Sequence, residues 1–223
     1  MCGRFTLTAT TTTLTETFPG LELADQPNPR YNITPTQDVA VVANNKSAKI
    51  EFFRWGLIPS WAKAPAIGNR MINARSETLA EKPSFRTAYK RRRCLILADG
   101  YYEWCKDPGG GAKTPYYIRM ASEQPFAFAG LWEQWKPTQE SDAVLSCTII
   151  TCPPNEMLEQ IHHRMPVILD NDAYDLWLNP TDRAPAELDR LLQPYPADEM
   201  TAYAVSRLVN KPSNDTPDCI LPV

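Results

Sequence analysis

The sequence predicts a β-rich α+β protein folded as a single domain over residues 1–223. The length suits one domain with a substantial core, and 43% of the residues are hydrophobic and 22% charged. The 21 prolines are roughly twice the usual proportion, which favours loops and short elements over long helices. Predicted strands and helices do not alternate regularly, which argues against a parallel doubly wound sheet.

Apolar segments bounded by turn residues predict the strands. Two of them flank the turn at 44–47 and form a predicted hairpin, and the loop at 107–113 is a predicted turn between strands. Asp99-Gly100 is a strong two-residue hairpin signal between two further strands. The predicted strands are 39–43, 50–55, 93–98, 101–106, 115–120, 126–135, 145–152, 164–169 and 200–206.

Helical patterns are fewer and cover 84–90, 171–178 and 186–192. The stretch 6–17 is rich in threonine and lacks an apolar run, so we expect no secretory signal and no membrane span. The six cysteines form no CxxC pair, and two histidines do not complete a metal cluster. We therefore expect no metal, no cofactor, and free thiols in a reducing cytoplasm.

The charge pattern limits how the chain could bind nucleic acid. A net charge of -3 gives no overall attraction to phosphate, so any such binding must depend on local arginines. The basic run 90–93 is by default a solvated face, with a phosphate track as the alternative. The tryptophans belong mainly to the core, except that Trp61, in a proline-rich loop, is a candidate stacking platform.

The start of the chain, Met1-Cys2-Gly3-Arg4, carries the most specific chemistry. A small residue at position two favours removal of Met1, which would place an α-amine and a thiol on Cys2. Their pKa values of roughly 8 and 8.5 leave part of each deprotonated at neutral pH. Such a residue can add to an aldehyde as an imine and then close a thiazolidine ring. The alternative is a small apolar residue near a terminus.

Two further side chains are candidates for acid–base chemistry. Strand alternation sends Glu103 to the face opposite Tyr102 and Trp104, where burial would raise the carboxyl pKa towards a useful value. The alternative is an exposed glutamate on an edge strand. His162 and His163 are adjacent and are expected to point in different directions, so one could be an acid or base. The alternative is a structural hydrogen-bonding role for both.

Asn73 and Arg75 lie two residues apart. In an extended segment both would project to one face, where the amide could orient a reacting group and the guanidinium could bind phosphate. The alternative makes Asn73 a turn residue and pairs Arg75 with Glu77.

Taken together, these segments closely resemble the SOS-response-associated peptidase (SRAP) proteins, also described as abasic-site processing proteins. The resemblance spans nearly the whole chain in the expected order, and several collinear motifs are more specific than any one alone. The matching segments are 1–5 (MCGRF), 30–35 (RYNITP), 54–61 (RWGLIPSW), 71–77 (MINARSE), 98–104 (ADGYYEW), 162–166 (HHRMP), 205–207 (VSR) and 221–223 (LPV).

The resemblance implies a single domain whose mixed and antiparallel sheets surround a DNA-binding channel. It implies that Cys2 crosslinks to abasic sites and that Asn73, Glu103 and His162 complete the active site. It also implies phosphate contacts by three arginines, Arg4, Arg75 and Arg164. Two tryptophans, Trp61 and Trp104, are implied as aromatic neighbours of the DNA. Two positions depart from the family pattern, since His163 is often acidic in relatives and Cys105 replaces a common lysine.

The hypothesis is therefore covalent capture of abasic sites in single-stranded DNA, in a DNA-damage (SOS) response, with weak abasic-site lyase activity as a side reaction. One alternative is a cysteine-type autopeptidase that removes its own leader. Another is a non-catalytic binder of single-stranded or modified DNA. We expect a monomer in the cytoplasm, associated with the nucleoid if bacterial, with abasic DNA and replication-fork proteins as partners and no membrane contact.

Overall fold

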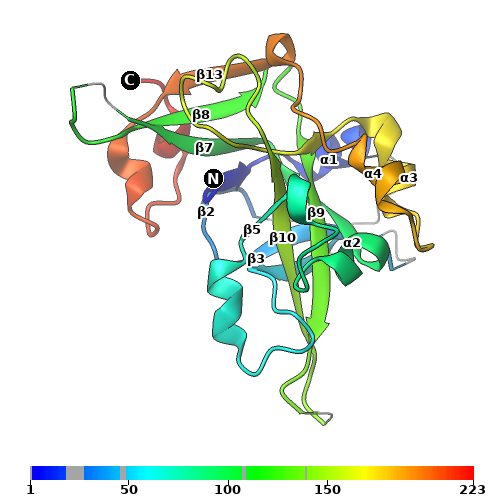
Figure 1. Cartoon of the computed structure of the whole chain (residues 1–223). Helices are drawn as coiled ribbons and strands as arrows, with labels where there is room; N and C mark the ends of the chain where they lie inside the picture. Colours follow the sequence, from blue (N-terminus) through cyan, green and yellow to red (C-terminus); the bar gives the residue numbers. More distant parts are fainter. Residues whose placement is uncertain (1, 19–27, 46–48, 107–108, 139) are drawn as a thin grey trace.

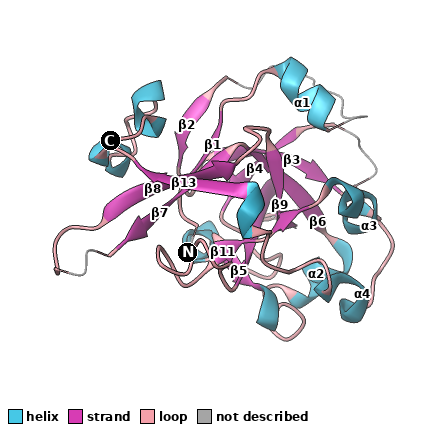
Figure 2. Ribbon diagram, turned by 90° about the horizontal axis from the view of Figure 1, so that it is seen from above, coloured by secondary structure: helices cyan, strands magenta, loops and turns pink. Residues whose placement is uncertain are grey.

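The computed structural model describes residues 2–18, 28–45, 49–106, 109–138 and 140–223. Two sheets dominate it, with short helices at the periphery (Figures 1 and 2). This arrangement confirms the predicted β-rich α+β class. No helix in the described part of the chain is long and apolar enough to cross a membrane.

Five strands of the larger sheet close into a barrel. In order around it they are β10, β4, β3, β6 and β9, and β9 returns to pair with β10. Only the β10–β4 contact in this ring is parallel. Their bounds are β3 (Asp38–Ala43), β4 (Glu51–Trp55), β6 (Arg93–Ala98), β9 (Phe126–Trp135) and β10 (Val144–Cys152).

Three short strands extend this barrel. The strand β5 (Asn73–Arg75) runs parallel to the end of β10, where Asn73 lies opposite Ile149. The strands β11 (Met165–Pro166) and β12 (Ile168–Leu169) pair antiparallel with β10 and β9, respectively. One continuous strand over 164–169 was therefore a wrong prediction, because the chain leaves β10 to join β9 at Val167.

The second sheet is antiparallel and has the order β13, β8, β7, β1, β2. In Figure 1 it crosses above the barrel, and β7 lies inside it between β8 and β1. This central place excludes the edge-strand alternative for Glu103. The bounds are β1 (Phe5–Leu7), β2 (Arg30–Ile33), β7 (Gly100–Cys105), β8 (Thr114–Met120) and β13 (Met200–Ala204).

The helices are short. The α-helices are α1 (Thr11–Thr17), α2 (Arg86–Arg91), α3 (Tyr174–Leu178) and α4 (Pro185–Asp189). The 3-10 helices are η1 (Pro65–Arg70), η2 (Ser76–Thr78), η3 (Asn171–Ala173), η4 (Ala197–Glu199), η5 (Arg207–Asn210) and η6 (Pro217–Ile220). The three predicted helices are confirmed as α2, η3 with α3, and α4, with shifted ends.

The helix α1 was missed because β-branched threonines disfavour a helix. Here the Thr10 side chain caps it by accepting from the Thr13 N–H, and Leu14 is buried. The pairing of β3 with β4 confirms the first predicted hairpin. Its turn at 44–47 and the turn at 107–113 lie partly outside the described residues.

The hairpin predicted at Asp99-Gly100 is wrong, because β6 and β7 belong to different sheets. Asp99 accepts hydrogen bonds from the Thr6 and Thr8 side chains and from the Ala9 N–H, which fixes the crossover between the sheets. A Cβ at position 100 would lie 2.1 Å from the Tyr117 hydroxyl oxygen. Gly100 therefore permits a close approach within the second sheet and does not form a tight turn.

The arginines of the basic run 90–93 form contacts within the protein. Arg93 is fully buried, which corrects the solvated-face prediction for this residue. Its guanidinium donates to the main-chain carbonyls of Tyr89, Lys90, Trp177, Asn179 and Thr181. Arg91 and Arg92 instead form ion pairs with Asp182 and Glu133. The contacts of Arg91 and Arg93 link the end of α2 and the start of β6 to α3 and the segment that follows it, and the Arg92 pair links the end of α2 to β9.

Arg93→Ala should lower the free energy of unfolding by about 3 kcal/mol or more, because buried carbonyls lose a charged donor. Arg91→Ala is the matched control, since its pair with Asp182 is more than half exposed on both sides. An exposed pair contributes about 1 kcal/mol at most. Urea denaturation of both variants measures the difference, and equal losses would contradict the structural role of Arg93.

Candidate functional site

The candidate site surrounds the main chain of Cys2, just before β1. The Asn73 side chain, on β5, donates from Nδ2 to the Cys2 carbonyl oxygen at 2.7 Å. Both views place the start of the chain next to β5 (Figures 1 and 2). The segment that carries Asn73 is extended, as the prediction for 71–77 required, and parallel pairing with β10 holds it there.

Glu103 faces this site from β7. Tyr102 and Trp104 pack into a separate cluster on the other face of the strand, as the predicted alternation requires. The Glu103 side chain is nearly buried, and burial raises its pKa from 4.5 to about 7. A carboxyl with this pKa can both accept and return a proton near neutral pH.

His162 lies opposite Glu103, with 3.8 Å between His162 Nε2 and a Glu103 carboxylate oxygen. Burial lowers the pKa of His162 to about 4, so the imidazole is neutral near pH 7 and the two groups do not form an ion pair there. The prediction that the adjacent histidines point apart is wrong. The rings of His162 and His163 stack with centroids 4.3 Å apart.

The Cys2 thiol is fully buried. Burial raises its pKa well above the ordinary range, and the negative charge of Glu103 adds to this shift. Its Sγ lies 3.9 Å from the Arg4 carbonyl oxygen. The protonated form of a thiol is a weak nucleophile, so burial disfavours reaction of Cys2 with electrophiles that approach from solution.

Two of the predicted phosphate-binding arginines have protein partners. Arg4 donates to the Asn32 side chain at 2.7 Å and to the Val209 carbonyl at 2.6 Å, and its guanidinium lies over the Trp104 ring. Arg164 is nearly buried and forms a bidentate ion pair with Glu77. A phosphate could reach Arg164 only if that pair opened, so the structure does not favour the predicted contact.

The other predicted DNA contacts are accessible. The Arg75 side chain is exposed. Glu77 forms its ion pair with Arg164, so the alternative in which Glu77 pairs with Arg75 is wrong. Trp61 is 57% exposed in the loop between β4 and η1, as expected for a stacking platform. Trp104 is half-buried and donates from Nε1 to Asn210 at 2.8 Å.

Comparison with known proteins assigns the chain to a family. The model described as SOS response associated peptidase (SRAP) matches residues 1–212. The chain belongs to the SRAP family. It is 48% identical over 224 residues to the abasic site processing protein YoqW of Bacillus subtilis (strain 168), covering 99% of each chain. It is 33% identical over 233 residues to the abasic site processing protein HMCES of Pongo abelii, covering 87% of this chain and 65% of that one.

The SRAP fold is also found in a solved structure. A crystal structure of a protein from Bacteroides thetaiotaomicron superposes with a TM-score of 0.89 at 28% identity, and each chain is covered completely. The two sheets described above are therefore the architecture of an SRAP domain.

Two residues of this SRAP site were missed from the sequence. Tyr101 shares the face of Glu103, and its buried hydroxyl has no hydrogen-bond partner among the described residues. The two-residue spacing could have indicated it. Glu77 was considered only as a partner for Arg75, and nothing in the sequence indicates its contact with Arg164 across 87 positions.

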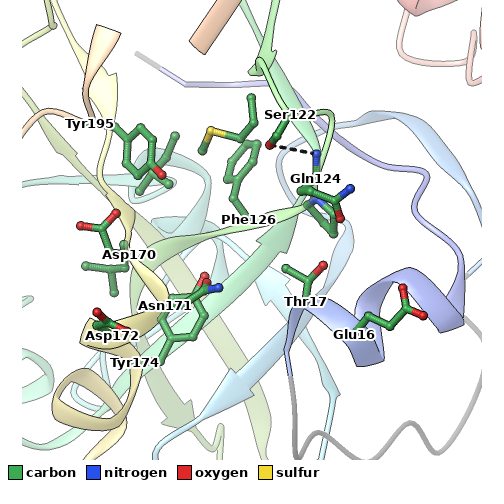
Figure 3. A pocket seen from close by; sticks show the side chains of 14 residues that line it. Glu16, Thr17, Ser122, Gln124, Phe126, Asp170, Asn171, Asp172, Tyr174 and Tyr195 are labelled. Atoms are coloured by element: carbon green, nitrogen blue, oxygen red, sulfur yellow. Dashed lines mark hydrogen bonds between the residues drawn. The ribbon is translucent and has the colours of Figure 1, made fainter. Parts of the chain in front are cut away.

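A roomy pocket of about 580 Å³ lies elsewhere on the SRAP domain, and none of its lining residues belongs to the predicted site. Figure 3 shows carboxylates of Glu16, Asp170 and Asp172 around it. The residues that line it include no lysine or arginine. A phosphate chain would be repelled there, so the Cys2 site is the better candidate for DNA chemistry.

The Glu103 pKa makes stability depend on pH. Glu103 ionises near pH 4.5 in the unfolded chain and near pH 7 in the folded protein. Folding therefore takes up a proton between these values, and the free energy of unfolding falls as pH rises through this window, by about 3 kcal/mol in total. Glu103→Gln carries no charge, so we expect it to be more stable than wild type at pH 8 and similar at pH 4. Urea denaturation at both pH values tests this, and a difference that is independent of pH would refute it.

Proposed function

We propose that this protein captures abasic sites in single-stranded DNA covalently, through a thiazolidine on Cys2. The observation that carries the proposal is the convergence of three segments around residue 2. Asn73 binds the Cys2 carbonyl, Glu103 is close enough to raise the pKa of its thiol, and His162 lies 3.8 Å from Glu103. The names of the similar abasic site processing proteins support this choice of substrate.

The first step is attack by the Cys2 amine, after removal of Met1, on the C1′ aldehyde of the ring-opened sugar. Glu103, with its pKa near 7, removes a proton from the attacking nitrogen. Neutral His162 donates a hydrogen bond from Nε2 to the aldehyde oxygen. Glu103 returns the amine protons to that oxygen, which leaves as water as the imine forms. Asn73 holds the Cys2 main chain in place by its hydrogen bond.

The second step closes the ring. The Cys2 sulfur bonds to the imine carbon, and the thiol proton moves to the nitrogen. Over the two steps one water is lost. Because the thiol and the imine share one residue, the effective concentration at the reacting carbon is very high. This suits a thiol that burial keeps protonated and away from other electrophiles. If closure failed, the imine could undergo β-elimination, which would give weak lyase activity as a side reaction.

The DNA strand in this proposal runs past Arg75 and Arg4, with Trp104 beside the guanidinium of Arg4. The exposed Trp61 is a further candidate for base stacking. Arginine supplies phosphate contacts and the indole rings supply stacking surfaces for bases. The autopeptidase alternative is less well supported, because a cysteine peptidase needs a thiolate and burial disfavours that form of Cys2.

A crosslinking assay tests the proposal. Wild-type protein should form an adduct that survives denaturing electrophoresis with single-stranded DNA containing an abasic site. The matched oligonucleotide carries tetrahydrofuran at the same position, which lacks the aldehyde and should bind without forming an adduct. Equal adduct with both oligonucleotides, or none with the abasic one, would refute capture through the aldehyde.

A further inference from the structure

The ion pair between Glu77 and Arg164 joins two segments that carry active-site groups. Glu77 lies on η2, immediately after the β5 strand that holds Asn73. Arg164 lies two residues after His162. Its guanidinium is held by both carboxylate oxygens of Glu77 and by the main-chain carbonyl of Thr151 on β10. The pair therefore fixes the turn at 162–164 against β5 and β10.

The main chain of Arg164 in turn controls the His162 ring. The imidazole Nδ1 lies 3.1 Å from the Arg164 N–H and 3.1 Å from its C=O. An N–H group can only donate, so a neutral ring that satisfies it carries its own proton on Nε2. That nitrogen is the one that faces Glu103. The other tautomer would donate from Nδ1 to the Arg164 carbonyl oxygen, but it would leave the Arg164 N–H without its acceptor and would present a lone pair to the ionised Glu103 carboxylate.

We propose that Glu77 is a positioning residue for His162. By holding the Arg164 guanidinium in a bidentate pair, it fixes the Arg164 main chain that keeps the imidazole proton on Nε2, directed at the reacting groups. Glu77 does not touch the reaction itself. Its side chain is about half exposed, so its removal should leave the fold intact. The kinetic consequence rests on the proposed function, whereas the tautomer does not.

The tautomer can be measured directly, because the chain has only two histidines. Nitrogen-15 NMR of imidazole-labelled protein, with His163→Asn to assign the signals, should show His162 protonated at Nε2 in the wild-type background. In Glu77→Gln the signals should move towards a mixture of tautomers. An unprotonated Nε2 in the wild-type background, or His162 signals unchanged by Glu77→Gln, would overturn the proposal.

Single-turnover capture at saturating protein then measures the effect on chemistry. We expect Glu77→Gln to slow capture roughly tenfold or more, the scale for losing an outer-shell partner. In a His162→Asn background the same change should have no further effect, because Glu77 acts through His162. The matched control is Glu187→Gln on α4, which removes a carboxylate of similar exposure from an ion pair with Arg183 and should leave the rate unchanged.

Equal slowing by Glu77→Gln with and without His162 would overturn the positioning role. So would a rise in affinity for the tetrahydrofuran oligonucleotide with an unchanged rate, which would make Glu77 a competitor of DNA phosphate for Arg164. If wild-type protein formed no adduct, the proposed function would fail. The NMR measurement would still decide whether Glu77 sets the His162 tautomer.

Discussion

An uncleavable residue placed before Cys2 should abolish stable adduct formation with abasic DNA and leave single-stranded DNA binding unchanged. The extension converts the Cys2 amine into an amide, whose delocalised lone pair cannot attack an aldehyde. The thiol remains, but alone it forms only a reversible hemithioacetal. Denaturing electrophoresis measures the adduct, and fluorescence anisotropy with the tetrahydrofuran oligonucleotide measures binding.

Two controls accompany the extended protein. Releasing Cys2 with a site-specific protease should restore capture. Cys2→Ala keeps the amine but cannot close the ring, so it should give only a labile imine that borohydride traps. Heat-stable adducts on the extended protein, or on Cys2→Ala without borohydride, would show that another residue is the nucleophile.

Glu103→Gln should slow capture by about 100-fold or more, which is typical for loss of a general acid or base. Glutamine is nearly isosteric, so the affinity for tetrahydrofuran DNA should change little. Wild-type capture should rise with pH through about 7 as Glu103 ionises, and the variant should lack this step. Stopped reactions at saturating protein across pH 5–9 measure both effects. Parallel losses of rate and affinity would instead assign Glu103 to binding or structure.

The sequence predicted local features well where one physical signal dominated. Period-two alternation placed Glu103 opposite Tyr102 and Trp104, and the limits of β9 agree with the apolar run at 126–135. The same reasoning failed at Asp99-Gly100, where a local hairpin signal competed with long-range hydrogen bonds from Thr6 and Thr8. Turn propensity cannot show that the next strand pairs in another sheet.

The residues of the candidate site and the raised pKa of Glu103 were predicted from the sequence, but the partners of the buried arginines were not. The basic run 90–93 suggested a solvated face for Arg93, and the family resemblance implied a phosphate contact for Arg164. Both side chains are instead buried against partners that lie far away in sequence. The ring stacking of His162 on His163 likewise depends on the turn at 162–164, which adjacent positions in a sequence do not specify. Such contacts depend on how segments distant in sequence pack together, and that information is not local.

The central claim is that the amine and thiol of Cys2 both bond to the sugar carbon. Intact-mass and peptide mapping of the purified adduct test it most directly. We predict a protein that lacks Met1, a mass gain equal to the DNA minus one water, and attachment on the peptide that begins at Cys2. Borohydride should add no hydrogen to this adduct. An adduct on protein that retains Met1, or attachment to any other peptide, would contradict the mechanism.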